Sequence, residues 1–375
     1  MKVALVHDWL VTMGGAETVL EEFFNLYPTA DIYTLFSEKK NLKNTNLYNA
    51  PIYNSSLQKL PMIKNIYRKL PNLFPQAIEE FDLGNYDLVI SSSHAVAKGV
   101  LTDAKTCHIS YLHTPMRYIW DLSFDYLKRA KFAFPIEWYT RNVFHQLRSW
   151  DIISSLRPDY LVANSNFIKQ RIQKVYRREA KVIYPPVSLS DKVYTDKEDF
   201  FVTASRHVPY KNIPLIAEAF AKMPTKKLVI LGDGPDSEKV KKICTLAKNI
   251  EYIGYQNKQV LMDTIGRAKA FVFAAEEDFG ILPVEAQSLG TPVIAYGVGG
   301  VTETVIANKT GIFFPTQSID SIKEAVLLFE SKEDSFDPTH IAAHSTIFSQ
   351  ERFKEEFNNY AQECYTNFNN NKLGA

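Results

Sequence analysis

The chain has 375 residues, of which 46% are hydrophobic and 23% charged, which is enough for roughly two globular domains with separate cores. A formal net charge of +1 gives no overall attraction to nucleic acid, so no nucleic-acid partner is expected. Cys107, Cys244 and Cys364 lie far apart without CxxC spacing, which disfavours a disulfide framework or a structural zinc site and suits a reducing cytoplasm.

The start of the chain, MKVALVHDWL, is too polar for a secretory signal, and no apolar run approaches about 18 residues. Short apolar runs then alternate with segments of helical period, as in parallel sheets covered by helices. The strand candidates are residues 2–6, 87–91, 107–112 and 160–163. Pro185 and Pro186 interrupt the pattern, so we expect a first domain over residues 1–184.

The same alternation restarts after the two prolines. The next strand candidates are residues 200–204, 227–231, 251–253, 270–274 and 292–295, which predict a second domain over residues 185–349. Residues 350–375 carry aromatic residues at helical spacing and are expected to form a terminal helix that packs back toward the first domain. The sequence therefore predicts an α/β protein with two Rossmann-like, doubly wound domains facing across a cleft, with ligand at the carboxyl ends of the strands.

The stretch EEDFGILPVE, residues 276–285, sets carboxylates on either side of an uncharged turn. Gly280 allows the chain to turn, and Pro283 favours a helix start, so a helix from Pro283 to Gly290 would carry Glu285 in its first turn. Glu277 would lie in the loop before it. The alternative is that Glu285 only stabilises the helix terminus and that Glu277 belongs to a solvated loop.

Between the two carboxylates, N–H groups at a helix N-terminus would form a phosphate site. These N–H groups belong to Gly280, Ile281 and Leu282. A nucleotide sugar has the matching shape, because its diphosphate carries hydroxyl-bearing rings on both sides. One carboxylate would accept hydrogen bonds from the ribose and the other from the sugar.

The spacing Glu277-x7-Glu285, followed by SLGTPVIAYGVGGVTETV at residues 288–305, resembles the EX7E retaining glycosyltransferases of family 4. The resemblance extends over essentially the whole chain. It implies the GT-B fold, a nucleotide-sugar donor as co-substrate, ribose binding by Glu285 and a place for Glu277 against the donor sugar. Retention of anomeric configuration by front-face attack is also implied. The loop with Gly299 and Gly300 is expected to support the site structurally.

The segment SRHVPYKN, residues 205–212, follows a predicted strand and carries Arg206 and Lys211. Two cations there can neutralise a diphosphate leaving group, and the resemblance implies this role. No DxD motif of the metal-dependent transferases occurs, so neither a metal ion nor another cofactor is expected. The loop LGDGPD, with Gly232 and Gly234, resembles the family's loop beside the nucleotide base.

Candidates in the first domain follow its predicted strands. The resemblance, which is closer for Gly15 than for Gly14, implies that these glycines of GGAE reach the donor phosphate. It also implies that His113 of HTPMR contacts the donor sugar. Without it, a tight turn and a structural histidine are the ordinary interpretations. The acceptor-side candidates are Arg117, Tyr118, His94 and Lys98; for the last two, structural roles are equally open.

Residues 56–74 and 126–144 mix basic and aromatic side chains. Basic amphipathic helices of this kind can lie on an anionic membrane, which would suit a glycan or lipid-linked acceptor; ordinary packing helices are the alternative. A cytoplasmic protein, with or without peripheral membrane contact, is expected.

The runs HTPMRYIWD and YDLVISSSHAVAKG most resemble mannosyltransferases of bacterial surface-polysaccharide assembly, which implies GDP-mannose as the donor. UDP-sugar donors, a nucleotide-sugar epimerase and a non-catalytic nucleotide-sugar-binding scaffold are the alternatives.

Overall fold

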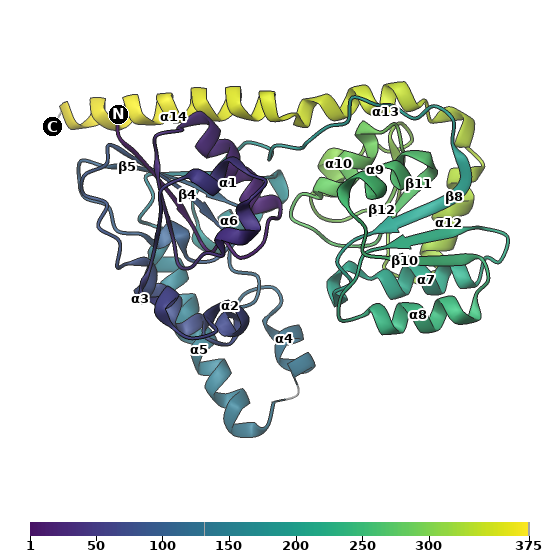
Figure 1. Ribbon diagram of the computed structural model, residues 1–375, viewed down its shortest axis with the longest axis horizontal. Helices are drawn as coiled ribbons and strands as arrows, with labels where there is room; N and C mark the ends of the chain where they lie inside the picture. Colours follow the sequence, from purple (N-terminus) through teal and green to yellow (C-terminus); the bar gives the residue numbers. More distant parts are fainter. Residues whose placement is uncertain (131, 374–375) are drawn as a thin grey trace. The chain divides into compact units, whose positions relative to one another are not determined.

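The computed structural model describes residues 1–130 and 132–373, which form two compact units. Unit 1 runs from Met1 to Pro186 and takes up the chain again from Gln350, and unit 2 is Val187–Ser349. Each unit contains one sheet with helices packed against it (Figure 1). All described pairings between the strands of each sheet are parallel, so the α/β class with two parallel sheets is confirmed.

The sheet of unit 1 has the strand order β3-β2-β1-β4-β5-β6-β7. Its strands are β1 (Val3–His7), β2 (Asp31–Thr34), β3 (Ile52–Asn54), β4 (Leu88–Ser93), β5 (Cys107–Leu112), β6 (Tyr160–Ala163) and β7 (Lys181–Val182). Strands β1, β4 and β5 are buried along their whole length, as parallel strands covered on both faces must be. The strand order reverses between β1 and β4, so ligand is expected beyond their carboxyl ends.

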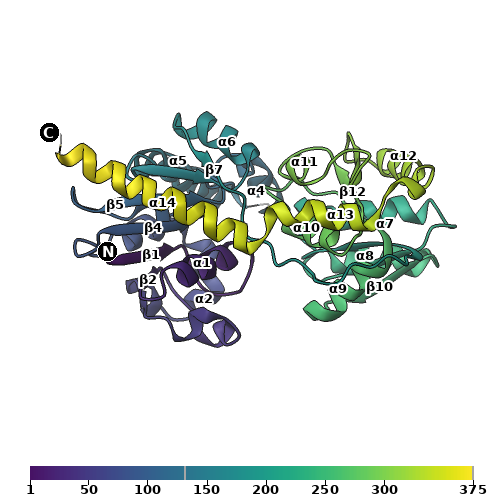
Figure 2. The same ribbon diagram turned by 90° about the horizontal axis from the view of Figure 1, so that it is seen from above.

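The helices of unit 1 are α1 (Gly15–Leu26), α2 (Ile63–Ile66), α3 (Phe74–Ile78), α4 (Ser123–Ala130), α5 (Phe134–Ser154), α6 (Asn166–Tyr176) and α14 (Gln350–Leu373). The terminal helix α14 lies against α1 and β5 in both views (Figures 1 and 2). Its Phe353 and Phe357 rings lie 5.7 and 4.4 Å from the ring of Phe23 in α1. This aromatic contact joins the first two turns of α14 to α1.

Residues 56–74 do not form the amphipathic helix that their pattern predicted. They fold as short 3₁₀ and α turns, and Ile63, Tyr67 and Phe74 are buried in the core of unit 1. Pro61 and Pro71 divide the segment, because proline lacks the N–H that a continuing helix needs. The expectation of a helix was wrong for this segment, and the burial of its aromatic residues favours the packing alternative.

The sheet of unit 2 has the strand order β10-β9-β8-β11-β12-β13. Its strands are β8 (Glu198–Ala204), β9 (Leu228–Leu231), β10 (Ile250–Gly254), β11 (Ala268–Phe273), β12 (Val293–Tyr296) and β13 (Gly311–Phe314). The helices are α7 (Ile213–Ala221), α8 (Ser237–Leu246), α9 (Lys258–Arg267), α10 (Ile281–Ser288), α11 (Val301–Thr304), α12 (Ile319–Glu330) and α13 (Pro338–Ser345). The order reverses between the neighbours β8 and β11, whose carboxyl ends carry the loops of greatest interest.

Candidate functional site

The loops after β8 and β11 bring the candidate catalytic residues of unit 2 together. Lys211 ends a 3₁₀ turn, Pro209–Lys211, that follows β8, and Glu277 lies in the loop after β11. Because the two strands are neighbours, these loops meet, and Lys211 Nζ forms an ion pair with Glu277 Oε1. The two side chains are 17% and 19% exposed, which leaves this ion pair partly reachable from solvent. Arg206, from the same loop as Lys211, is exposed.

The backbone around Glu277 is fixed by two glycines. The Gly300 N–H donates to the Glu277 carbonyl oxygen at 2.8 Å. Gly299 has φ of 91°, and a Cβ there would lie 2.5 Å from that same oxygen, while a Cβ at Gly300 would lie 2.3 Å from Phe279 Cα. Only residues without a side chain allow this close approach. The geometry agrees with the supporting role expected of this loop.

Helix α10 begins at Ile281, two residues before the predicted start at Pro283. Gly280, with φ of 91°, precedes the helix as its N-cap, and Pro283 occupies the third helical position. The prediction was wrong because the N–H groups of the whole first turn lack intrahelical acceptors, so proline is tolerated there as well. Glu285 consequently lies in the second turn, where a helix-dipole role is weaker, while Gly280, Ile281 and Leu282 lie at the N-terminus.

Glu285 is 7% exposed and forms an ion pair with Lys258, the first residue of α9. Burial raises the pKa of Glu285, and the charge and hydrogen bond of Lys258 act in the opposite direction. The net effect raises the pKa of Glu285, and its carboxyl oxygens can accept hydrogen bonds from ligand hydroxyls. Sequence reasoning missed Lys258, whose only local signal is the capping residue Asn257, which places the lysine in the first turn of α9.

Gly232 and Gly234 pack against the loop that carries Arg206. A Cβ at Gly232 (φ 111°) would lie 1.8 Å from Ser205 O, and one at Gly234 would lie 2.6 Å from His207 O. The loop after β9 therefore requires glycine for its own packing. Their place beside a nucleotide base stays a prediction.

Three histidines gather at the carboxyl ends of β1, β4 and β5 in unit 1. Ser92 Oγ lies 3.1 Å from His7 Nδ1 and 2.8 Å from His113 Nε2. Burial lowers the pKa of His113 well below its usual value, and it outweighs the nearby Asp8 carboxylate, which acts in the opposite direction. His113 is therefore neutral at neutral pH.

Asp8, at the end of β1, is fully buried and organises the loop after β4. Its carboxylate accepts hydrogen bonds of 2.6 to 3.0 Å from four backbone N–H groups, those of His94, Ala95, Val96 and Ala97. His94 Nδ1 lies 3.0 Å from the same carboxylate. Burial acts to raise the pKa of Asp8, but His94, His7 and the N–H groups outweigh it, so the pKa is lowered. Sequence reasoning missed His7 and Asp8, although "HD" directly after the first strand was a usable signal.

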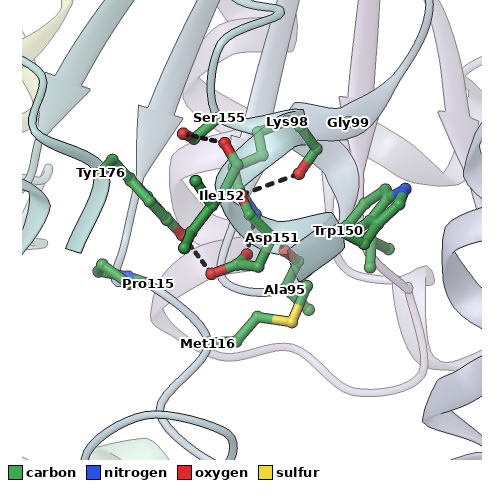
Figure 3. Close-up of polar contacts among 12 residues, drawn as sticks. Ala95, Lys98, Gly99, Pro115, Met116, Trp150, Asp151, Ile152, Ser155 and Tyr176 are labelled. Carbon is green, nitrogen blue, oxygen red and sulfur yellow. Dashed lines mark hydrogen bonds and ion pairs between the residues drawn. The ribbon is translucent and has the colours of Figure 1, made fainter. Parts of the chain in front are cut away.

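Lys98 is buried, 1% exposed, and does not line an acceptor cleft. Its Nζ donates to Asp151 Oδ1 at 2.5 Å and to Ala95 O at 2.9 Å. Asp151 Oδ2 in turn accepts from Trp120 Nε1 at 2.8 Å and from the Tyr176 hydroxyl at 2.9 Å. Figure 3 shows Lys98 and Tyr176 directed at Asp151. The acceptor-side expectation for Lys98 is corrected, because its ammonium has a fully buried carboxylate from α5 as its partner.

The remaining candidates of unit 1 lie in two loops. Arg117 and Tyr118 are half-buried, and the Tyr118 hydroxyl contacts Met116 Sδ at 3.3 Å. Burial raises the pKa of Tyr118. Gly14 and Gly15 are exposed at the start of α1.

Comparisons with known proteins support the fold of the chain and the similarity of unit 2 to glycosyltransferases. Residues 190–342 match the family model described as glycosyl transferases group 1. Every candidate residue of unit 2, from Arg206 to Glu285, lies within this matched segment.

Two curated relatives are similar to parts of the chain. The GDP-mannose-dependent monoacylated alpha-(1-6)-phosphatidylinositol monomannoside mannosyltransferase of Corynebacterium glutamicum is 30% identical over 154 residues, covering 38% of this chain and 40% of that protein. The alpha-1,3/1,6-mannosyltransferase ALG2 of Kluyveromyces lactis is 26% identical over 265 residues, covering 54% and 53%. The chain thus spans about half, or less, of the length of these relatives.

Solved structures match nearly the whole chain. The lipopolysaccharide outer core galactosyltransferase WaaB has a TM-score of 0.67 at 19% identity, covering 96% of this chain and 98% of that one. HepE of Anabaena in complex with UDP has a TM-score of 0.69 at 17% identity, covering 97% and 100%. These likenesses show that the chain has the GT-B fold, as the sequence predicted.

Proposed function

We propose that the chain is a retaining glycosyltransferase that moves mannose from GDP-mannose to a glycan or lipid-linked oligosaccharide in surface-polysaccharide biosynthesis. The observation that carries the proposal is the ion pair between Lys211 and Glu277 at the ends of β8 and β11. It sets a cation for the diphosphate beside a carboxylate for the sugar, as a reaction at the bond between sugar and diphosphate requires. The group 1 family match over residues 190–342 supports it.

In this proposal, different residues of unit 2 bind different parts of the donor. Lys211 and the exposed Arg206 neutralise the charge that develops on the departing diphosphate. The N-terminus of α10, with Gly280, binds phosphate, and buried Glu285 binds the ribose hydroxyls. A nucleoside diphosphate leaves as an anion and needs no general acid, in contrast to the leaving group of a glycosidase. We propose that no metal ion or other cofactor takes part and that transfer occurs by front-face attack.

Mannose is proposed because relatives from Corynebacterium and Mycobacterium are named as GDP-mannose-dependent mannosyltransferases. A UDP-sugar is the second candidate, since the structurally similar HepE was solved with UDP. Calorimetric titration with GDP, UDP and ADP separates the two. Selective binding of GDP is expected. Selective binding of UDP would leave the phosphate site in place but remove mannose, and binding of no nucleotide would contradict the proposal and favour a scaffold without catalysis.

We propose that unit 1 receives the acceptor and contacts the cytoplasmic face of a membrane. No helix in the described ranges 1–130 and 132–373 is long and apolar enough to cross a bilayer. However, α4 and the first half of α5 project from the body of unit 1 (Figure 1), and Phe124, Phe134, Ile136 and Trp138 there are each more than half exposed. Lys131, part of the basic pattern predicted for this segment, lies outside the described residues.

Exposed aromatic side chains of this kind insert at the headgroup boundary of a bilayer. Cosedimentation with vesicles containing anionic lipid tests this contact. Trp138→Ser should reduce the bound fraction, while Tyr255→Ser, at an even more exposed aromatic residue of unit 2, should not. Equal binding by the wild type, Trp138→Ser and Tyr255→Ser would contradict the membrane contact.

A further inference from the structure

A line of four polar side chains connects α1 to the end of β5 within unit 1. Glu17 Oε1 lies 3.8 Å from His7 Nε2, His7 Nδ1 lies 3.1 Å from Ser92 Oγ, and Ser92 Oγ lies 2.8 Å from His113 Nε2. His7 and Ser92 are fully buried, and Glu17 is 7% exposed. Of the four, only His113 is half-buried and can meet a ligand.

The hydroxyl of Ser92 couples the protonation of the two imidazoles. A serine hydroxyl has one proton, so when it bridges two imidazole nitrogens it donates to one and accepts from the other. If Ser92 donates to His7, then His113 donates from Nε2 and keeps a lone pair on Nδ1. If Ser92 donates to His113 instead, then His7 donates from Nδ1 and neutral His113 carries its proton on Nδ1.

Glu17 decides between these two arrangements. Its distance of 3.8 Å from His7 Nε2 is too long for a hydrogen bond, but the carboxylate is buried and its charge acts strongly at this range. An N–H directed at the carboxylate is favoured over a lone pair directed at it. A neutral His7 with its proton on Nε2 must accept on Nδ1, which sets the direction of both bonds of Ser92.

The neighbouring charged groups do not reverse this preference. Asp8, the other buried carboxylate at this edge of the sheet, already accepts from four backbone N–H groups and lies 3.0 Å from His94 Nδ1. The ring of His94 lies 6.0 Å from that of His7 and 6.3 Å from that of His113, and its Nδ1 is paired with the Asp8 carboxylate. The ring of Tyr111 lies 5.3 Å from that of His113 and brings no charge.

We propose that Glu17, acting through His7 and Ser92, holds His113 in the tautomer protonated on Nε2, so that Nδ1 accepts a hydrogen bond from a hydroxyl group of the substrate. Glu17, His7 and Ser92 are then positioning residues that make the site selective for a hydroxyl donor. The identity of that donor as a sugar hydroxyl rests on the proposed function, whereas the tautomer does not.

The tautomer is measured by ¹⁵N NMR of the full chain with ¹⁵N-labelled histidine, with the His113 signals assigned by their loss in His113→Gln. The expected result is a protonated Nε2 and an unprotonated Nδ1 in His113, and the same tautomer in His7. Ser92→Ala should give a mixture of tautomers at His113. Ser93→Ala is the matched control, because that buried hydroxyl in the same strand has no hydrogen-bond partner in the described structure. Protonation of His113 on Nδ1 in the wild type, or of His7 on both nitrogens, would overturn the proposal.

The second readout uses monodeoxy analogues of the donor sugar. For the analogue that lacks the hydroxyl bound by His113, the kcat/KM of the wild type should be about tenfold lower than for the complete donor sugar. Ser92→Ala should not distinguish this analogue from the complete sugar, because its His113 no longer has a fixed acceptor nitrogen. Glu17→Gln should lie between the two. If no nucleotide sugar is turned over, the proposed function fails while the NMR result still decides the tautomer. If transfer occurs and the discrimination is the same in Ser92→Ala and wild type, the selectivity role is refuted.

Discussion

Lys211 and Glu277, from loops that follow two neighbouring strands, form an ion pair in unit 2. A lysine in this position can stabilise an anion that develops beside it. The pair therefore places a cation for the diphosphate directly beside a carboxylate for the sugar, as the proposed reaction requires.

Substitution of Lys211 by Met should reduce sugar transfer by about 10²- to 10³-fold with a much smaller effect on thermal unfolding. The matched control is Lys226→Met, which breaks a 2.6 Å ion pair with Glu330 elsewhere in unit 2. Steady-state rates and melting curves of both variants make the comparison. Equal rates for Lys211→Met and the control would refute the diphosphate role.

Substitution of Glu285 by Gln should weaken binding of the free nucleotide by about tenfold, because an amide accepts fewer hydrogen bonds from ribose hydroxyls than a carboxylate does. Calorimetry gives the affinity directly. Glu218→Gln, an exposed glutamate of α7, serves as the control. An unchanged affinity in Glu285→Gln would exclude the ribose contact.

Substitution of Asp151 by Asn should destabilise the protein by about 3–5 kcal/mol, because it leaves the buried Lys98 ammonium without a charge partner. The double variant Lys98→Met, Asp151→Leu should lose less than Asp151→Asn alone, since it leaves no buried charge. Urea unfolding of the three proteins measures these differences. A larger loss in the double variant would show that the hydrogen bonds from Tyr176 and Trp120 to Asp151 contribute more than the buried charge costs.

Burial lowers the pKa of Lys197 to about 7, while its Nζ donates to Gly266 O at 2.8 Å and Thr291 Oγ1 at 3.0 Å. Between that pKa and the ordinary lysine value of 10.5, the unfolded chain binds a proton that the folded chain does not. The contribution of Lys197 to the free energy of unfolding should therefore increase as pH rises through that window. Below pH about 7 the folded protein bears the full cost of burying the charged ammonium. Lys197→Met should flatten this part of the pH profile. A slope identical to that of the wild type would contradict the lowered pKa.

The regular parts of the fold could be predicted from local sequence. The strands at residues 107–112 and 160–163 have the predicted bounds, because continuous apolar runs mark buried parallel strands. Strands β2, β3, β7 and β13 were missed. The segments DIYT and IYN contain polar residues and no continuous apolar run, β7 has only two residues, and GIFF begins with glycine, which disfavours a strand.

The positions of Lys211 and Glu277 in loops that follow strands could be predicted from local sequence. Partners from other elements could not. Lys258 comes from the start of α9, and the partner of Lys98 comes from α5, so neither contact has a signal near the residue concerned. Burial of Lys98 depends on Asp151, which lies far along the chain, and only tertiary packing brings the two together.

The most direct test of the proposed activity is the release of nucleoside diphosphate from a panel of GDP-, UDP- and ADP-sugars, with and without chelator, by the wild type and Lys211→Met. The proposed activity predicts release of GDP from GDP-mannose by the wild type, unchanged by chelator and strongly reduced in Lys211→Met. Equal release by both proteins, or no release from any donor in the presence of lipid-linked and glycan acceptors, would contradict it.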